Sequence, residues 1–411
     1  MRDAANAGTR TPPDKTDGST TDNHVLQSST AGPLHGVKVL ELGGIGPGPF
    51  AGMLLADLGA DVIRVDRLTG TTPQQRDSHL VLHRGRRSLA LDLRREQGRD
   101  VVLELAQNHD VIIEGFRPGV AERLGVGPRE ILERNPRIVY GRMTGWGQEG
   151  PLANAAGHDI NYIALAGALE SIAAPDGTPV PPLNMLGDFG GGGMLMALGV
   201  VAAVLNARQT GIGQVVDAAI VDGASLMTAM LHSMAATGRW NGERRANLLD
   251  GGAPFYGVYR TLDDRWLAVG AIEPQFYTNL LDGLGLADEL AGIAQDDRSF
   301  WPTVRERIAA RIAERTRTDW ESVFDRMDAC VCAVLSPDEV IDHPHIRARG
   351  TFFERDGHLE PSPAPRFSVT PTATPPPAPQ SGADTRKILA DTGFRDEVID
   401  RLIAANVVAE V

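Results

Sequence analysis

Cysteine and basic residues are scarce in this 411-residue chain. Its only cysteines are Cys330 and Cys332, so a disulfide framework is excluded and a reducing compartment fits. Lys and Arg number 40 against 53 Asp and Glu, which gives a formal net charge of −13. This balance argues against nucleic acid as the main partner, because binding to its phosphates needs a surplus of Lys and Arg. It does not exclude a small anionic ligand held by a few arginines.

A long hydrophobic run is also lacking. The longest uncharged stretch, residues 189–207, opens on the glycines 190–193. We expect these glycines to form a turn followed by about 14 helical residues, whereas about 20 are needed to cross a membrane. Residues 1–31 are polar, lack apolar periodicity and contain no signal-peptide pattern, which predicts a disordered extension. The sequence therefore predicts a cytoplasmic protein with no membrane partner.

Short β-branched runs alternate with helical patterns in the first half of the chain. Strands are predicted at residues 36–42, 61–66, 110–114 and 138–142, and helices at 50–59 and 95–107. Strands that alternate with helices in this way indicate a mostly parallel sheet with helices on its faces. We predict an open, Rossmann-like α/β sheet in a large domain whose first part spans residues 32–220.

The pattern changes after residue 220. Runs at 256–259 and 266–270 predict a sheet, and helices are predicted at 303–313 and 320–327. Residues 221–350 are thus interpreted as linkers and a smaller α+β domain. The proline-rich stretch 361–380 is typical of an extended connector. We expect residues 351–411, which end in a helix at 396–403, to return to the large domain and complete it.

A glycine-rich turn at residues 43–48 separates the first strand from the first helix. Asp66 follows about twenty residues later at the end of a strand, as in an NAD-binding site. However, Pro47 and Pro49 lack the N–H groups that a pyrophosphate would use. Arg67 directly after Asp66 favours a phosphate over a bare ribose. Three interpretations stay open here: NAD, a phosphorylated adenosine, and a structural turn without ligand.

Several longer motifs carry a family resemblance. The segments 43–50 (GGIGPGPF) and 56–62 (ADLGADV) resemble the opening of family III CoA transferases. The α-methylacyl-CoA racemase branch of that superfamily is indicated by the segments 157–162 (GHDINY), 186–192 (LGDFGGG), 249–255 (LDGGAPF) and 269–277 (VGAIEPQFY). The resemblance covers about residues 33–365. It implies a 2-methylacyl-CoA substrate, no cofactor besides the CoA that is part of that substrate, and an interlocked homodimer.

Racemisation of such a thioester requires two groups on opposite sides of the α-carbon. One removes the proton and the other returns one, while fixed donors stabilise the enolate oxygen. His158 is a candidate because an unperturbed imidazole, as a chemical group, already titrates near neutrality. Asp188 precedes the glycine run and is expected at a helix N-terminus, which favours an ionised carboxylate. The purely structural alternatives are a hydrogen-bonded core residue for His158 and a helix N-cap for Asp188.

The resemblance assigns His158 and Asp188 as the two catalytic bases and Glu273 as a support for the histidine. A solvent-exposed glutamate at a strand end is the alternative for Glu273. Asp159 keeps a CoA transferase open, because those enzymes pass CoA through a mixed anhydride on an aspartate. A third hypothesis is a non-catalytic module that binds acyl-CoA or NAD.

Arginines near the strand ends are candidates for the CoA phosphates, since a guanidinium pairs bidentately with phosphate. Each could also be a solvated surface residue. The resemblance points to Arg67, Leu91, Asp92, Leu93, Arg94 and Arg117 for CoA, and to Gly157, Asp159, Ile160, Asn161 and Tyr162 for the substrate. No metal site is predicted, because the Cys-x-Cys and His-x-His spacings at 330–332 and 343–345 are not those of usual zinc sites.

Overall fold

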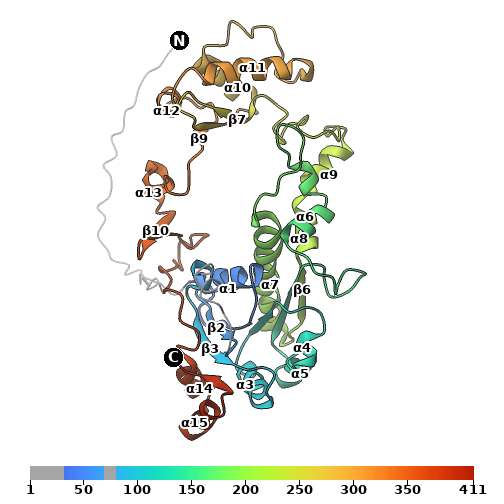
Figure 1. The fold of residues 1–411 in the computed structure, drawn as a ribbon, viewed down its shortest axis with the longest axis vertical. Helices are drawn as coiled ribbons and strands as arrows, with labels where there is room; N and C mark the ends of the chain where they lie inside the picture. The colour runs from blue at the N-terminus through green and yellow to red at the C-terminus, as the bar shows by residue number, and fades with distance from the viewer. Residues whose placement is uncertain (1–31, 69–79) are drawn as a thin grey trace, which may run out of the picture.

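A seven-stranded sheet forms the centre of the larger part of the molecule in the computed structural model, which describes residues 32–68 and 80–411 (Figure 1). The strand order is β12-β3-β2-β1-β4-β5-β6. The strands are β1 (Lys38–Leu42), β2 (Asp61–Asp66), β3 (Arg87–Leu91), β4 (Val111–Glu114), β5 (Val139–Thr144), β6 (Val215–Ala219) and β12 (Val408–Ala409). All neighbours are parallel except β12 and β3. The predicted open, mostly parallel sheet is confirmed, while the predicted extension 1–31 lies outside the described residues.

Apolar side chains bury both faces of the central strands, as a parallel sheet requires. Val39 and Leu40 of β1 are wholly buried and lie on opposite faces, because successive residues of a strand alternate. The face of Leu40 packs against α3 (Glu96–Ala106), α5 (Pro128–Arg134), α14 (Thr385–Asp391) and α15 (Asp396–Ala404). The face of Val39 packs against α1 (Pro47–Asp57) and α7 (Leu195–Thr210).

The strand order reverses between β1 and β4. From β1 the chain proceeds to β2 and β3 on one side, and from β4 to β5 and β6 on the other. In open α/β sheets, ligands bind at the carboxyl ends of the strands at such a point. The two segments there are the glycine turn before α1 and the loop 115–119 between β4 and α4 (Val120–Arg123). They are close neighbours, since a Cβ on Gly115 would lie 3.6 Å from Gly44 Cα.

The second glycine-rich stretch is helical, and the turn predicted there is wrong. Met185–Met194 form a π-helix, η3, that runs directly into α7. η3 packs against α1 and against α8 (Ile220–Met227). A Cβ on Gly191 would lie 2.6 Å from the backbone nitrogen of Ala224, so the close approach of η3 and α8 depends on glycine. Glycines on their own favour irregular backbone, so packing against neighbouring helices stabilises the helical conformation of this stretch.

The combined helix Met185–Thr210 is, within the described chain, the one helix whose length and composition would allow it to cross a membrane. In its most apolar window, 44% is buried, and α7 packs against β5 and β6. The core helix of a soluble protein passes the same test. The absence of a membrane partner therefore stays a prediction, although the short-helix reason for it was wrong.

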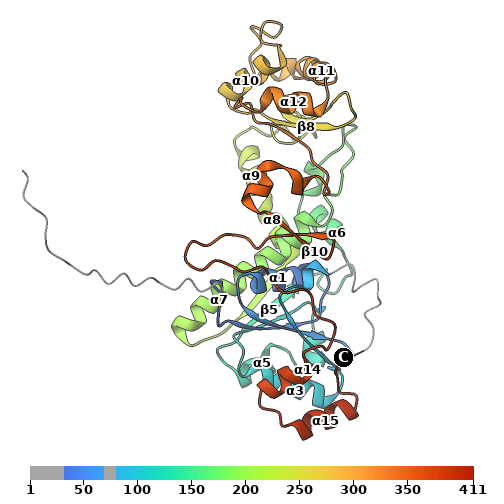
Figure 2. The same ribbon diagram turned by 90° about the vertical axis from the view of Figure 1, so that its left-hand side faces the viewer.

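The smaller part of the molecule has an antiparallel sheet in the order β7-β8-β9 with three helices packed on it. Its elements are β7 (Tyr256–Arg260), β8 (Trp266–Gly270), α10 (Pro274–Leu284), α11 (Trp301–Ile312), α12 (Arg317–Phe324) and β9 (Val331–Ala333). Two connections on opposite sides join it to the larger part (Figure 1, Figure 2). One contains α8 and α9 (Ala229–Ala236); the other contains α13 (Pro344–Arg349), β10 (Phe352–Arg355) and β11 (His358–Pro361). The predicted domain boundaries stay predictions.

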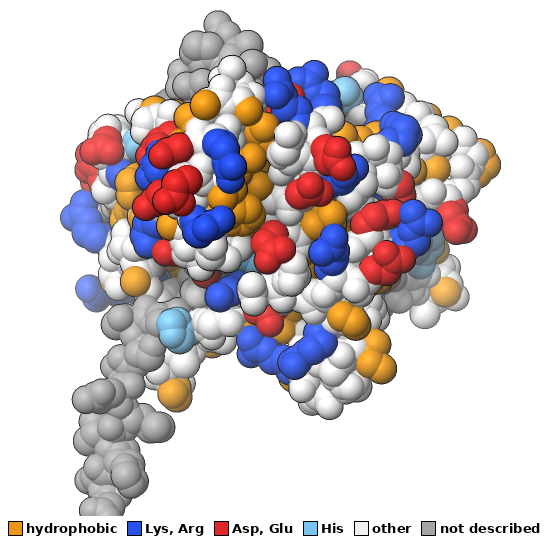
Figure 3. Space-filling view, turned by 90° about the horizontal axis from the view of Figure 1, so that it is seen from below, with side chains coloured by type: hydrophobic (Ala, Val, Ile, Leu, Met, Phe, Trp, Pro, Cys, Tyr) orange, Lys and Arg blue, Asp and Glu red, His pale blue; other side chains and the backbone are white. Residues whose placement is uncertain are grey.

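The chain returns to the large sheet after the proline-rich connector. β12 pairs antiparallel with β3, and Ile399 and Leu402 of α15 belong to the core of the large sheet. On the surface, Arg386 of α14 pairs with Asp400 and Glu410. Figure 3 shows the molecule from below relative to Figure 1, and on this face positive and negative side chains are intermixed. The described part of this face therefore offers no continuous basic surface to nucleic acid.

Candidate active site

A cavity of about 410 Å³ lies at the carboxyl edge of the large sheet, beside the reversal of strand order. Its lining comes from the glycine turn before α1, the loop after β4, the segment that follows β5, and η3. The predicted site residues that line it are Arg117, Gly157, His158, Tyr162 and Asp188. The structure thus brings the two predicted bases to one cavity.

The backbone around His158 is fixed from both sides. Asn161 Oδ1 accepts a hydrogen bond from the His158 N–H (3.0 Å), and the Tyr162 hydroxyl donates to the Gly157 carbonyl (2.5 Å). Both partners come from the first turn of α6 (Asp159–Leu165), which begins directly after His158. The Tyr162 ring is itself packed edge-on against Trp146. These contacts hold the histidine backbone and leave its exposed side chain available to a ligand.

Asp188 lies half-buried in the first turn of η3. Its Oδ2 accepts a hydrogen bond from Asn184 Nδ2 (3.4 Å), and a Cβ on Gly46 would lie 3.0 Å from this oxygen. Burial raises the pKa of Asp188, and the nearby Asp159 carboxylate also raises it, whereas Asn184 and His158 oppose the shift. A carboxylate with a raised pKa is a stronger base than an aspartate in water, which suits proton abstraction.

Asp159 connects the segments that carry the two predicted bases. Its side chain is buried, and Oδ1 accepts a hydrogen bond from the Asp188 N–H (2.6 Å). Oδ2 is also buried and has no hydrogen-bond partner among the described residues. Neither Asp159 nor the exposed Ile160 belongs to the lining of the cavity. Asp159 therefore supports the start of η3 from behind and does not face a ligand in the cavity.

A second cavity, of about 340 Å³, lies at the carboxyl ends of β2 and β3. The predicted CoA residues Arg67, Leu91, Asp92, Leu93 and Arg94 all line it. Phe116 lines both this cavity and the one that holds His158 and Asp188. The two cavities are therefore neighbours across Phe116, and an extended ligand could occupy both.

The arginines of the second cavity differ in availability. Arg94 donates from Nε and Nη2 to the two carboxylate oxygens of Asp92, at 2.9 Å and 3.0 Å. Arg67 is exposed, and among the described residues no carboxylate forms an ion pair with it. Arg67 is therefore the cation of this cavity best placed to receive a phosphate.

The carboxylate of Asp66, which an NAD site would use for the ribose, is already occupied. Arg64 donates to it from Nε (2.8 Å) and Nη2 (2.7 Å), and the Ser88 hydroxyl donates at 2.6 Å. The helix after the glycine turn also begins at Pro47, which has no N–H to offer a pyrophosphate. This geometry favours a phosphorylated adenosine over NAD.

Glu273 is not near either cavity within one chain. It is exposed at the start of α10, in the smaller part at the top of Figure 1, and lines neither cavity. The nearby Cys330 and Cys332 are exposed, free thiols. Within the described chain, no group of three or more His, Cys, Asp or Glu residues is placed to hold a metal ion.

Two further residues shape the site. The family resemblance includes the segment 116–119 as a CoA-lining segment, but nothing in the residue type of Phe116 indicated that it separates two cavities. Asn184 lies outside the motifs, and its contact with Asp188 depends on the π-helical winding of η3.

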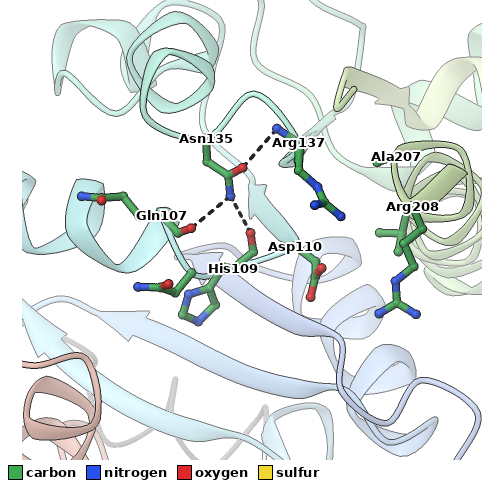
Figure 4. A pocket seen from close by; sticks show the side chains of 9 residues that line it. Gln107, His109, Asp110, Asn135, Arg137, Ala207 and Arg208 are labelled. Atoms are coloured by element: carbon green, nitrogen blue, oxygen red, sulfur yellow. Dashed lines mark hydrogen bonds between the residues drawn. The ribbon is translucent and has the colours of Figure 1, made fainter. Parts of the chain in front are cut away.

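A further cavity lies at the opposite, amino-terminal edge of the sheet (Figure 4). Its lining includes Asp110 and Arg137, which precede β4 and β5, and Arg208 of α7. Asn135 Nδ2 donates to the carbonyls of Ala106 and His109, at 2.9 Å each. These polar contacts hold the ends of the connecting loops. None of the predicted site residues lines this cavity.

Comparison with known proteins adds to this geometry. Residues 34–385 match CoA-transferase family III. The sequence is 44% identical over 378 residues to the alpha-methylacyl-CoA racemase of Mus musculus, across 91% of this chain and 97% of the mouse protein. It is 30% identical over 404 residues to the succinyl-CoA–D-citramalate CoA-transferase of Chloroflexus aurantiacus, across 92% of this chain and 98% of that protein.

A solved structure shares the fold. The crystal structure of a CAIB/BAIF family protein from Brucella suis matches with a TM-score of 0.77 and 24% identity, and the match covers 88% of this chain and 100% of that one. This likeness concerns the arrangement of helices and strands.

Proposed function

Because the chain belongs to CoA-transferase family III and is a racemase, we propose that it interconverts the (R) and (S) epimers of 2-methylacyl-CoA thioesters. The observation that carries the proposal is the single cavity lined by both His158 and Asp188. The neighbouring cavity with the available Arg67 supports a substrate that carries phosphates. An acyl-CoA ester is long enough to need both cavities.

We propose a 1,1-proton transfer between two faces of the α-carbon. His158 takes the α-proton of one epimer, and the electron pair of the C–H bond passes into an enolate with its charge on the thioester oxygen. The protonated Asp188 then gives a proton to the opposite face, and the carbonyl re-forms. In the other direction the Asp188 carboxylate is the base and the His158 imidazolium the acid. The raised pKa of Asp188 favours the protonated form that donates in one direction and makes its carboxylate a stronger base in the other.

The geometry of Asp159 disfavours the alternative of a CoA transferase. A nucleophilic carboxylate must reach the acyl carbon of its substrate. Asp159 is buried behind the cavity, and one of its oxygens accepts the Asp188 N–H. We propose that Asp159 positions the start of η3 and contributes to the raised pKa of Asp188.

We propose that the reaction needs no cofactor, because it changes no oxidation state and exchanges only a proton. CoA is then part of the substrate. The enzyme lowers the activation barrier of the step by positioning the reacting groups and by stabilising the enolate charge.

We also propose an interlocked homodimer. Large apolar side chains are exposed on α7 of the large sheet and on the two helices of the first connection: Leu198 and Leu205 of α7, Leu226 and Met227 of α8, and Met230 of α9. A monomer rarely leaves such a surface uncovered. The two connections between the parts are widely separated in Figure 1, an arrangement that fits a chain interlocked with a second copy. In this assembly Glu273 of one protomer would support His158 of its partner.

The proposed function is tested by incubating the protein in D₂O with one epimer of a 2-methylacyl-CoA. Deuterium at the α-carbon together with the opposite epimer supports racemisation. Transfer of CoA to an added free acid would instead identify a transferase. Binding of the ester without either event would leave only an acyl-CoA-binding module.

Arg67→Ala is expected to weaken binding of full CoA esters much more than binding of thioesters that lack the nucleotide. A lost charge-assisted contact to phosphate costs on the order of 1.5–3 kcal/mol. The comparison of KM for the full and the truncated ester measures the difference. Arg208→Ala is the control, since Arg208 is an exposed arginine that lines the cavity at the opposite edge of the sheet and neither of the two ligand cavities. Equal losses for both substrates would contradict the role of Arg67.

A further inference from the structure

A buried glutamate lies directly before the loop that separates the two cavities and takes no part in the proton transfer. Glu114 is the last residue of β4 and is fully buried. Its Oε2 accepts a hydrogen bond from the Phe116 N–H (2.6 Å), and its Oε1 accepts one from Arg142 Nε (3.0 Å). The carboxylate therefore ties its own loop to the neighbouring strand β5.

The same guanidinium also holds the far end of this loop. Arg142 donates from Nη1 and Nη2 to the carboxylate of Glu122 on α4, at 2.8 Å and 3.3 Å. Between these two ties the loop turns tightly: the Val120 N–H donates to the Arg117 carbonyl (3.1 Å), and Gly119 has a φ of 79°. The loop 115–119 is thus held at both ends by one arginine.

The loop carries two side chains that face the ligand cavities. Phe116 lines both cavities, and a Cβ on Gly43 would lie 3.7 Å from its ring, so the ring covers the glycine turn. Arg117 is exposed and lines the cavity of His158 and Asp188. A shift of this loop would move the wall between the cavities and a cation that faces the substrate.

We propose that Glu114 is a positioning residue for the CoA ester: its carboxylate fixes the loop 115–119 and so places Phe116 between the two cavities and Arg117 at the cavity of His158 and Asp188. The proposal rests on the proposed function, because it assumes that a CoA ester spans both cavities. Glu114 touches no ligand itself and acts only through the loop.

The charges around Glu114 make this positioning depend on pH. Arg142 is one cation facing two carboxylates, Glu114 and Glu122. The pKa of the exposed Glu122 is lowered by a hydrogen bond from its own backbone N–H and by Arg142, whereas burial raises the pKa of Glu114 to about 7. The other titratable group nearby is the Tyr140 phenol, whose pKa is raised by burial and which is neutral at this pH. As the pH falls through 7, the proton therefore goes to Glu114 and weakens its acceptance from Arg142 and Phe116.

The test is the affinity of the full chain for free CoA, titrated by calorimetry at pH 8 and at pH 6. Glu114→Gln mimics the protonated carboxyl and places an amide N–H₂ against one of the two donors. At pH 8 the variant is expected to bind CoA about tenfold more weakly than the parent chain, as for a lost charge-assisted contact. At pH 6 the parent is itself largely protonated at Glu114, and the two should agree within about twofold.

Two further variants test whether the loss of CoA affinity is specific to Glu114 and its loop. Glu360→Gln changes another buried, ion-paired glutamate, one that contacts Arg84 and Arg355 and lines neither cavity, and it should leave CoA affinity unchanged. In a background that lacks both side chains placed by the loop, Phe116→Ala with Arg117→Ala, the change Glu114→Gln should weaken CoA binding by no more than about twofold, because Glu114 acts only through these two residues.

A ratio of affinities that is the same at pH 6 and pH 8 would overturn the proposal. So would an equal loss in Glu360→Gln, since the effect would then reflect general destabilisation. A parent chain that racemises and binds CoA while Glu114→Gln binds it equally well contradicts only the role of Glu114. A parent chain that does not bind CoA contradicts the proposed function as well.

Discussion

His158→Ala and Asp188→Ala should each abolish interconversion of the two epimers in both directions. Every inversion uses one of the two groups as base and the other as acid, so neither variant can complete it. Loss of one general base costs about 10²–10⁴-fold in rate. The measurement is the appearance of the opposite epimer from a single pure epimer of a 2-methylacyl-CoA.

Proton exchange should distinguish the two variants. In His158→Ala, Asp188 can still remove the proton that faces it and return a deuteron to the same face, so one epimer exchanges slowly without inversion. Asp188→Ala should exchange only the other epimer. His345→Ala, on α13 and outside both cavities, serves as the control and should racemise normally. If both variants exchange the same epimer, the two residues act on one face, and the second base must be another residue.

Gly223→Ala should disrupt the packing of α8 against η3, lower the free energy of unfolding and remove most of the activity. A Cβ on Gly223 would overlap the backbone carbonyl of Gly191 in η3, and neither backbone is free to move without displacing the other helix. Overpacking of this kind costs about 1–3 kcal/mol, and occasionally more. Because Asp188 lies on η3, a displacement of about 1 Å is expected to lower the rate about 100-fold.

The checks are the free energy of unfolding in denaturant and the racemisation rate. Gly48→Ala is the control for stability: a Cβ there meets no atom within 4 Å, and Gly48 lies in α1 with no positive φ. This control should stay within about 1 kcal/mol of the parent chain. An equally stable and active Gly223→Ala protein would mean that η3 and α8 do not pack as closely as described.

The strands of the large sheet that could be predicted contain, or directly follow, adjacent Val, Ile or Leu residues. β1, β2 and β4 contain such pairs, and in β5 the pair is Ile138 and Val139 at its start. β3 has no such pair, and in β6 two valines are followed by Asp and two Ala, which are uncommon in strands. β12 has only two residues, and its pairing with β3 depends on a contact across nearly the whole chain.

The candidate site could also be predicted only in part. His158 and Asp188 could be found because their chemistry and flanking motifs were both informative, and the structure lines one cavity with them. The turn predicted at the glycines 190–193 was wrong because helical winding there depends on packing against α8, which no local pattern reveals. The roles of Glu273, the homodimer and the cytoplasmic location stay predictions, because nothing within one chain tests them.

The pairing of β12 with β3 has a consequence for how the protein is made on the ribosome. Val408 and Leu91 are neighbours in the sheet but about 300 residues apart in the chain. Synthesis proceeds at about 5–20 residues per second, so β3 waits tens of seconds for its edge partner. During that time the smaller part can fold on its own local contacts, while the edge of β3 stays open to other strands. We therefore expect the nascent chain to need protection at this edge, for instance by a chaperone, until α15 and β12 have been synthesised.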